Sequence, residues 1–185
     1  MYDIPAILFA GGKSSRMGTD KALLPFKNFK TLSEFQHHKL QQVFNEVYIS
    51  SKENKFDFDC NIIYDIYETN SPLIALLSIF ETLDSENIFI LSVDTPLVDN
   101  SIFNTLHEAH NLNVDVTVAK SPKSLEPLCA IYNRSIVPQI KSVLKKDMHK
   151  LQHLLKLVNT QTVQFKDATL FTNLNYMHEY KAFTS

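Results

Sequence analysis

The chain has 185 residues, 44% of them hydrophobic, which is enough for one sizeable core and lies within the usual range of a single domain. Its formal net charge of −2 gives no reason to expect a nucleic acid as a partner, and no apolar run approaches the length of about 18 residues that a membrane helix needs. No signal peptide opens the sequence, and Cys60 and Cys129 lack any paired spacing, so we expect a cytoplasmic protein with reduced thiols.

Strand-like and helix-like segments alternate along the chain. Short apolar segments predict strands over residues 4–10, 46–50, 61–64, 87–93, 114–119, 128–132 and 160–165. Helical spacing of apolar residues predicts helices over residues 32–44, 72–83, 100–110, 135–144 and 148–157. Thr31 and Asp99 are among the residues available as helix caps. This alternation predicts an α/β fold with a mainly parallel sheet that helices cover on both faces.

All three glycines of the chain, Gly11, Gly12 and Gly18, follow the first predicted strand. Glycine can adopt a positive φ, which lets successive amides converge on one anion. Cationic and hydroxyl side chains lie among these glycines and just after them: Lys13, Ser14, Ser15, Arg16 and Lys21. Because such side chains neutralise and grip phosphate oxygens, the segment predicts a phosphate-binding loop. A tight turn with solvated charges is the alternative.

Two common nucleotide motifs do not fit this loop. Gly12-Lys13-Ser14 matches the end of a P-loop, but that motif needs a glycine where this chain has Ile7. The dinucleotide fingerprint also fails, because the three glycines have a different spacing. The loop is therefore of a third type.

Residues 9–26, FAGGKSSRMGTDKALLPF, resemble the signature of the molybdopterin-nucleotidyltransferase family, which includes the guanylyltransferases of molybdenum cofactor. The resemblance implies a three-layer, Rossmann-like nucleotidyltransferase fold. It also implies that Arg16 and Lys21 contact phosphates and that four residues line the nucleotide: Phe9, Ala10, Gly11 and Gly12. Phe9 stands where the family usually has leucine.

A second motif ends the strand predicted over residues 87–93. The apolar run leads into Asp94-Thr95-Pro96, which places a carboxylate at the edge of the sheet where ligands gather and where Mg²⁺ on a nucleotide needs oxygen ligands. From the pattern alone, an ordinary turn is an equal alternative. The resemblance identifies Asp94 as the family's magnesium-binding aspartate, whereas Asp99 is better interpreted as a helix cap.

The resemblance assigns two further residues to the nucleotide. Asp65 aligns with an aspartate that leads into a G-P-L turn, which this chain replaces with Ser71-Pro72-Leu73. Ser50 aligns with an asparagine and presents fewer hydrogen-bonding groups. Serine at position 71 adds bulk and a hydroxyl where relatives have glycine. Both departures weaken the assignment of guanine as the base.

The second half of the chain resembles the part of the family that lies around the pterin substrate. Residues 126–132 match its H/E-P-L-x-A-L-Y strand, and residues 170–175 match its F-x-N-x-N segment. Asn173 and Asn175 are the candidate molybdopterin contacts, with a turn and a helix cap as the alternative. Four lysines are weaker candidates, since each alone is more typical of a solvated surface: Lys120, Lys145, Lys146 and Lys150.

The resemblance implies one domain over residues 1–185, with an N-terminal half that binds nucleotide and a C-terminal half that binds molybdopterin. It implies the transfer of GMP from GTP to molybdenum-molybdopterin with release of pyrophosphate, using Mg²⁺ and the catalytic residues Arg16, Lys21 and Asp94. Cofactor-delivery proteins and molybdoenzyme chaperones are further partners that such a role could involve. Two alternatives stay open: a related cytidylyl- or sugar-phosphate nucleotidylyltransferase, and a non-catalytic nucleotide-binding accessory protein.

Overall fold

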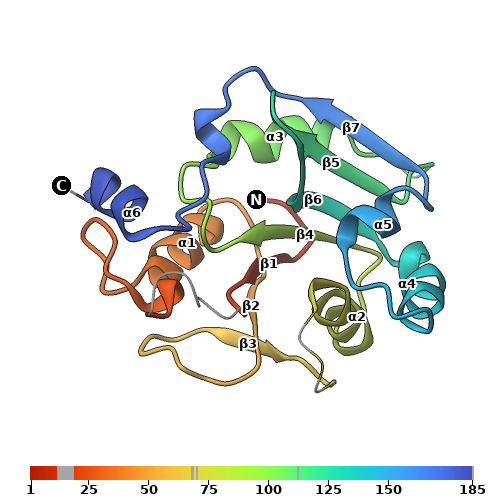
Figure 1. The fold of residues 1–185 in the computed structure, drawn as a ribbon, viewed down its shortest axis with the longest axis horizontal. Helices are drawn as coiled ribbons and strands as arrows, with labels where there is room; N and C mark the ends of the chain where they lie inside the picture. Colours follow the sequence, from red (N-terminus) through yellow and green to blue (C-terminus); the bar gives the residue numbers. More distant parts are fainter. Residues whose placement is uncertain (12–18, 68, 70, 112, 185) are drawn as a thin grey trace.

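The computed structural model describes residues 1–11, 19–67, 69, 71–111 and 113–184. Within them, seven strands form one sheet with the order β3-β2-β1-β4-β6-β5-β7 (Figure 1). The strands are β1 (Ala6–Phe9), β2 (Val47–Ser51), β3 (Asn61–Tyr64), β4 (Asn87–Ser92), β5 (Val116–Lys120), β6 (Leu125–Asn133) and β7 (Thr160–Gln164). β6 runs antiparallel to its neighbours β4 and β5, whereas the other strand pairs are parallel. The predicted α/β class and mainly parallel sheet are confirmed.

The predicted helices are present, and three of them begin at capping side chains. The described helices are α1 (Leu32–Gln41), α2 (Pro72–Thr82), α3 (Asn100–Ala109), α4 (Val137–Leu144), α5 (Leu151–Leu155) and α6 (Met177–Thr184). Side-chain oxygens of Thr31, Ser71 and Asp99 accept from the first-turn amides of α1, α2 and α3. In the part of the chain described here, no helix is both long and apolar enough to cross a membrane.

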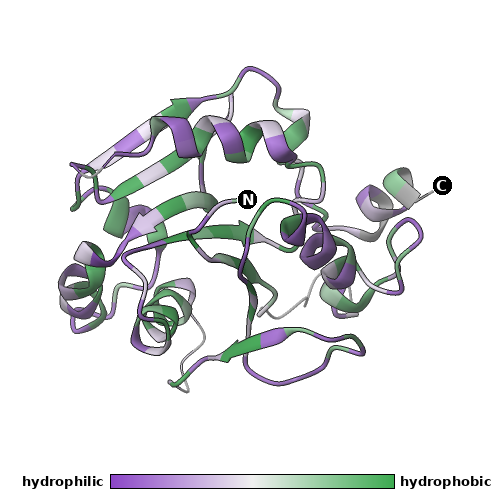
Figure 2. Ribbon diagram, turned by 180° about the vertical axis from the view of Figure 1, so that it is seen from behind, coloured by the Kyte–Doolittle hydropathy of each residue, from purple (hydrophilic) through white to green (hydrophobic). Residues whose placement is uncertain are grey.

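Alternate residues of the central strands face two separate cores. On β1, Ala6 and Leu8 pack into a core with α1 and α3, while Ile7 and Phe9 pack into a second core with α2, α4 and α5. This alternation is the period of an extended strand with both faces covered. Figure 2 shows the central strands as predominantly hydrophobic and the outward helix faces as more hydrophilic. The predicted three-layer arrangement is confirmed.

The helix predicted over residues 148–157 is shorter in the structure. Asp147 adopts a positive φ of 57°, and the amide of Met148 donates to the carbonyl of Val143 at 3.1 Å. A left-handed residue followed by such a bond closes a helix. The chain therefore turns after α4 and enters α5 only at Leu151.

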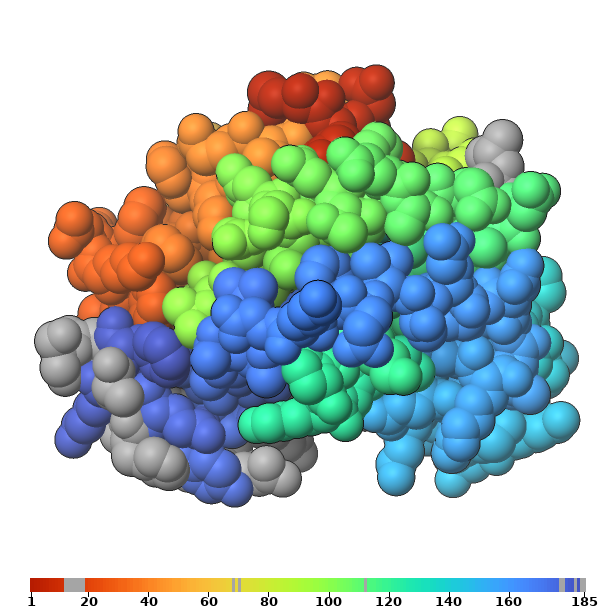
Figure 3. Space-filling model, turned by 90° about the horizontal axis from the view of Figure 1, so that it is seen from above, coloured from red at the N-terminus to blue at the C-terminus, as the bar shows by residue number. Residues whose placement is uncertain are grey.

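The C-terminal segment returns to the first half of the sheet and to the segment before α1. The amide of Leu174 donates to the carbonyl of Asp94 at 2.8 Å, and the hydroxyl of Tyr180 donates to the carbonyl of Pro25. Phe171 and Leu174 are buried in the core that contains α1 and α3. Figure 3 shows the C-terminal residues, in blue, lying against green and orange residues from earlier in the chain. Side chains from distant parts of the sequence can therefore meet at one edge of the sheet.

Phe89 packs the central strand β4 against α3 and against the segment that follows α1. Its side chain is 1% exposed, and its ring lies 5.2 Å from that of Phe44 and 4.9 Å from that of Phe103, between centroids. We expect Phe89→Ala to lower the free energy of unfolding by about 3–5 kcal/mol, since it leaves a cavity between three elements. Urea denaturation measures this loss.

Leu157→Ala is the matched control for this substitution, because Leu157 is 53% exposed. It should change the free energy of unfolding by no more than about 0.5 kcal/mol. Equal losses in the two variants would contradict the central packing role of Phe89.

Candidate active site

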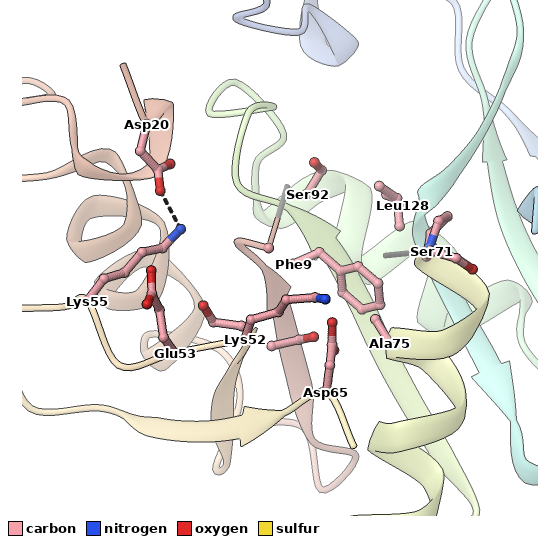
Figure 4. Close-up of a pocket in the computed structure, with 14 residues that line it drawn as sticks. Phe9, Asp20, Lys52, Glu53, Lys55, Asp65, Ser71, Ala75, Ser92 and Leu128 are labelled. Atoms are coloured by element: carbon pink, nitrogen blue, oxygen red, sulfur yellow. Dashed lines mark hydrogen bonds and ion pairs between the residues drawn. The ribbon is translucent and has the colours of Figure 1, made fainter. Parts of the chain in front are cut away.

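A cavity of about 620 Å³ lies beyond the carboxyl ends of β1 and β2. Figure 4 shows its lining, with the ring of Phe9 and the side chain of Ala75 on one side and the loop after β2 on the other. Parallel α/β sheets bind ligands at this edge, where strand ends and loops leave a crevice. Its volume is typical of small-molecule binding sites.

The structure brings four of the predicted nucleotide residues to this main cavity: Phe9, Gly11, Ser50 and Asp65. Ala10 is adjacent, and its amide donates to the carbonyl of Ser50 at 3.1 Å. Gly12 and Arg16 lie outside the described residues, so their predicted contacts stay predictions.

The structure shows the backbone geometry at two positions where the sequence raised the role of glycine, Gly11 and Ser71. Gly11 does not adopt a positive φ, and a Cβ built there would meet the Ser50 carbonyl and the Ser51 Cα at 3.8 Å, an ordinary contact. Ser71, which the resemblance aligns with a family glycine, has an extended backbone with φ −156° and ψ 142°. Its hydroxyl accepts from the amide of Ile74 at 3.3 Å. The turn therefore needs no glycine, because serine begins α2 as a helix cap.

Asp65, which lines the main cavity, carries an unsatisfied acceptor. Its Oδ1 is buried and has no hydrogen-bond partner among the described residues. Burial raises the pKa of the Asp65 carboxyl, and the charge of Lys52 partly opposes that rise. Figure 4 shows the Asp65 and Lys52 side chains on the same side of the cavity. A buried acceptor is costly unless a donor reaches it, so a ligand hydroxyl or N–H group would fit this position.

Lys21 and Asp94 meet at the end of β4. The Lys21 ammonium forms an ion pair with Asp94 Oδ2 and donates to Asn175 Oδ1 at 3.1 Å. The Ser92 hydroxyl donates to the other carboxylate oxygen, Asp94 Oδ1, at 2.6 Å. The side chains of Lys21 and Asp94 are 20% and 13% exposed. Three residues that the sequence predicted separately thus form one cluster: Lys21 from the N-terminal loop, Asp94 from the end of the central strand, and Asn175 from the C-terminal segment.

The cluster lies beside the main cavity. A smaller cavity of about 150 Å³ is lined by Asp94, Asn173 and Phe171 and shares Ser92 and Leu128 with the main cavity. Both of the predicted asparagines therefore lie near the metal candidate. Of the weaker lysine candidates, Lys150 lines a further cavity of about 380 Å³, which borders the main cavity at Ser71, Pro72 and Leu128.

Sequence reasoning missed a second ion pair beside the glycine loop. Lys55 pairs with Asp20 and also donates to the carbonyl of Ala10 at 3.2 Å. Asp20 in turn accepts from the amide of Ala22 at 3.0 Å and caps the 3₁₀ turn η1 (Lys21–Leu23). Lys55 thus ties the end of β1 to the turn that carries Lys21. Lys55 lies in the loop between β2 and β3, where no local pattern distinguishes it from a solvated lysine.

The donor set around Asp94 fits a magnesium ion that arrives with a nucleotide. Asp94 offers a carboxylate, and the Ser92 hydroxyl lies beside it. The described residues contain no group of three or more His, Cys, Asp or Glu side chains that could hold a metal ion by themselves. Mg²⁺ commonly binds through one or two carboxylates, with substrate phosphates and waters as the other ligands. The residues present therefore fit shared coordination rather than a metal cage built from protein alone.

A family model described as the MobA-like NTP transferase domain matches residues 6–164. The chain belongs to this family. Molybdenum cofactor guanylyltransferase from Campylobacter jejuni subsp. doylei is 37% identical, over all of this chain and 97% of the relative. The protein of that name from Helicobacter pylori strain G27 is 32% identical, over 97% of this chain and 90% of the relative.

A solved structure has the same fold as this member of the family. Molybdopterin-guanine dinucleotide biosynthesis protein A from Archaeoglobus fulgidus superimposes with a TM-score of 0.82, at 16% identity, over 98% of this chain and 97% of that one. The nucleotidyltransferase fold that the sequence implied is confirmed.

Asp65→Asn is expected to stabilise the ligand-free protein at pH 7, because it removes a carboxylate whose charged form is disfavoured by burial. Since the folded pKa is raised, the folded state binds more protons than the unfolded chain between pH 3.8 and the folded pKa. As the pH rises through that window, the free energy of unfolding of the wild type should therefore fall in comparison with that of Asp65→Asn.

Thermal unfolding of the wild type and Asp65→Asn as a function of pH measures this difference. Asp84→Asn, at an exposed position, is the matched control and should leave the unfolding temperature at pH 7 nearly unchanged. An Asp65→Asn protein that is less stable than the wild type at pH 7 would contradict the buried-charge interpretation.

Proposed function

We propose that this protein is a molybdenum cofactor guanylyltransferase, which transfers GMP from GTP to molybdenum-molybdopterin and releases pyrophosphate. The observation that carries the proposal is the contact of Lys21 with Asp94, 73 residues apart in sequence, beside a nucleotide-sized cavity. The full-length similarity to two relatives with this name supports the choice of substrates.

The main cavity is the proposed site of the guanine and ribose. Phe9 and Ala75 offer apolar surface for the base, and the buried Oδ1 of Asp65 can accept from a ribose hydroxyl or a base N–H group. Ser50 adds a hydroxyl at the end of β2. Ala10 and Gly11 follow β1 at the rim of this cavity, on the side where we place the triphosphate.

Lys21, Asp94 and Arg16 are the proposed catalytic residues. An oxygen of the terminal phosphate of molybdopterin forms a bond to the α-phosphorus of GTP, and the bond from that phosphorus to the pyrophosphate oxygen breaks. The nucleophile is already anionic, so no protein base is required. Lys21 and Arg16 would stabilise the negative charge that develops on pyrophosphate. Mg²⁺, held by Asp94 with Ser92 beside it, would neutralise phosphate charge when bound.

The acceptor is proposed to lie on the C-terminal side of Asp94. The smaller cavity is continuous in its lining with a third one of about 280 Å³, since both include Glu126, Phe171 and Asn173. Lys123 and Asn175 also line this third cavity. A polar groove suits the hydrogen-bonding edge of a pterin, and Lys123 offers a cation for its phosphate beside the carboxylates of Glu126 and Glu179. On this proposal residues 1–185 act as one domain, whose halves bind the two substrates.

Loss of either charge in the cluster should slow the reaction. We expect Asp94→Asn and Lys21→Met to reduce turnover by roughly two to three orders of magnitude, as for other preorganised charges at a transition state. Pyrophosphate release in the presence of GTP, Mg²⁺ and molybdenum-molybdopterin measures the effect. Lys30→Met is the control, since the Lys30 side chain is 75% exposed. Wild-type rates in either cluster variant would show that its role is misassigned.

The identity of the transferred nucleotide is tested separately. Incubation of the wild type with molybdenum-molybdopterin and GTP, CTP or ATP, followed by mass detection, should yield the guanine dinucleotide product and little of the others. A preference for CTP would support the cytidylyl alternative. Binding of nucleotide without any transfer product would support the accessory-protein alternative.

A further inference from the structure

Two side chains of α1 bind the backbone of the loop that carries Asp94. This Asp94 loop comprises residues 92–98. Gln36 Nε2 donates to the carbonyls of Ser92 and Val93, both at 3.3 Å. Lys39 Nζ donates to the carbonyls of Pro96 at 3.1 Å and Val98 at 2.6 Å. One helix thus supplies donors on both sides of Asp94.

The two donors lie in a protected environment. Gln36 is fully buried, and burial lowers the pKa of Lys39 to about 7. Two charged groups from other elements act on the Lys39 charge, Asp99 at the start of α3 and Lys27 before α1, and Cys129 on β6 is the third titratable group that faces it. Burial raises the pKa of the Cys129 thiol, so this thiol is neutral near pH 7. Charged or neutral, the Lys39 nitrogen has enough N–H groups for both carbonyls, so its contacts do not depend on titration.

The same helix also contacts the turn that carries Lys21. Ser33, which is buried near the start of α1, donates its hydroxyl to the carbonyl of Ala22 at 2.7 Å. Ala22 directly follows Lys21 in η1. α1 is therefore bonded to the backbone on both sides of the Lys21–Asp94 ion pair, although it contributes no side chain to the ion pair itself.

We propose that Lys39 is a positioning residue which, together with Gln36, holds the Asp94 loop so that the carboxylate faces Lys21 and the incoming nucleotide. The catalytic consequence of this positioning rests on the proposed function. The structural consequence, a more rigid Asp94 loop, does not depend on that function. Without Lys39, the carbonyls of Pro96 and Val98 would lose a buried donor, and buried acceptors without donors favour local opening.

Hydrogen exchange of the ligand-free protein tests the structural part. The amides of Thr95 and Val98 donate within the loop, to the carbonyls of Ser92 and Thr95, so they report its opening. Lys39→Met keeps an apolar stem of similar length and should raise their exchange rates by about tenfold or more. Lys39→Arg, which retains donors, should raise these rates less, and the exposed control Lys30→Met should leave them unchanged.

The kinetic part uses the Mg²⁺ dependence of transfer. In Lys39→Met the concentration of Mg²⁺ that gives half-maximal activity should rise by about tenfold, with a smaller change in the rate at saturating Mg²⁺. A defect in overall folding would instead lower the active fraction at every Mg²⁺ concentration. Absence of transfer by the wild type would overturn the proposed function and the kinetic part, while the exchange measurement would still decide the structural part.

Unchanged exchange at Thr95 and Val98 in a folded Lys39→Met protein would overturn the proposal. If Lys39→Met does not fold, Gln36→Met removes the other pair of donor contacts at similar volume. Faster exchange in the Asp94 loop of this second variant would support the proposal. Exchange equal to the wild type would overturn it.

Discussion

The ion pair between Lys21 and Asp94 is the contact on which the site depends. Its two charges come from η1 and from the end of β4, and Asn175 of the C-terminal segment binds the same ammonium. An ion pair of limited exposure stabilises a structure only when its surroundings fix the geometry. Here that geometry is fixed by the Ser92 hydroxyl, by the bond from Leu174 to the Asp94 carbonyl, and by α1.

The fold explains why these groups can be so far apart in sequence. β1 and β4 are adjacent and parallel, so the loops that follow them leave the sheet at the same edge. The C-terminal segment then crosses that edge and supplies Asn173 and Asn175. Consequently the main cavity, where we place the nucleotide, and the proposed acceptor groove meet at the end of β4, and group transfer would require the two substrates to be aligned there.

Much of this architecture could be predicted from the sequence, because it has strong local signals. Such signals mark the apolar runs of β1 and β4, the loop that follows β1, and Asp94 after β4. Other features depend on contacts that no local pattern encodes. Lys55, Gln36 and Lys39 act through backbone carbonyls of distant segments. The direction of β6 and the presence of α6 likewise follow from tertiary packing. The departure from the family pattern at Ser71 gave a misleading signal, because a serine that caps a helix can stand at the same position as the glycine of a turn.

The most direct test of the central claim is a double-mutant cycle on Lys21 and Asp94, read as kcat/KM for pyrophosphate release. If the two charges act as one unit, the variant with both Lys21→Met and Asp94→Asn should lose little more activity than the more damaged single variant. If the losses of the two single variants multiply in the double variant, Lys21 and Asp94 contribute independently, and the account of a single paired centre is wrong.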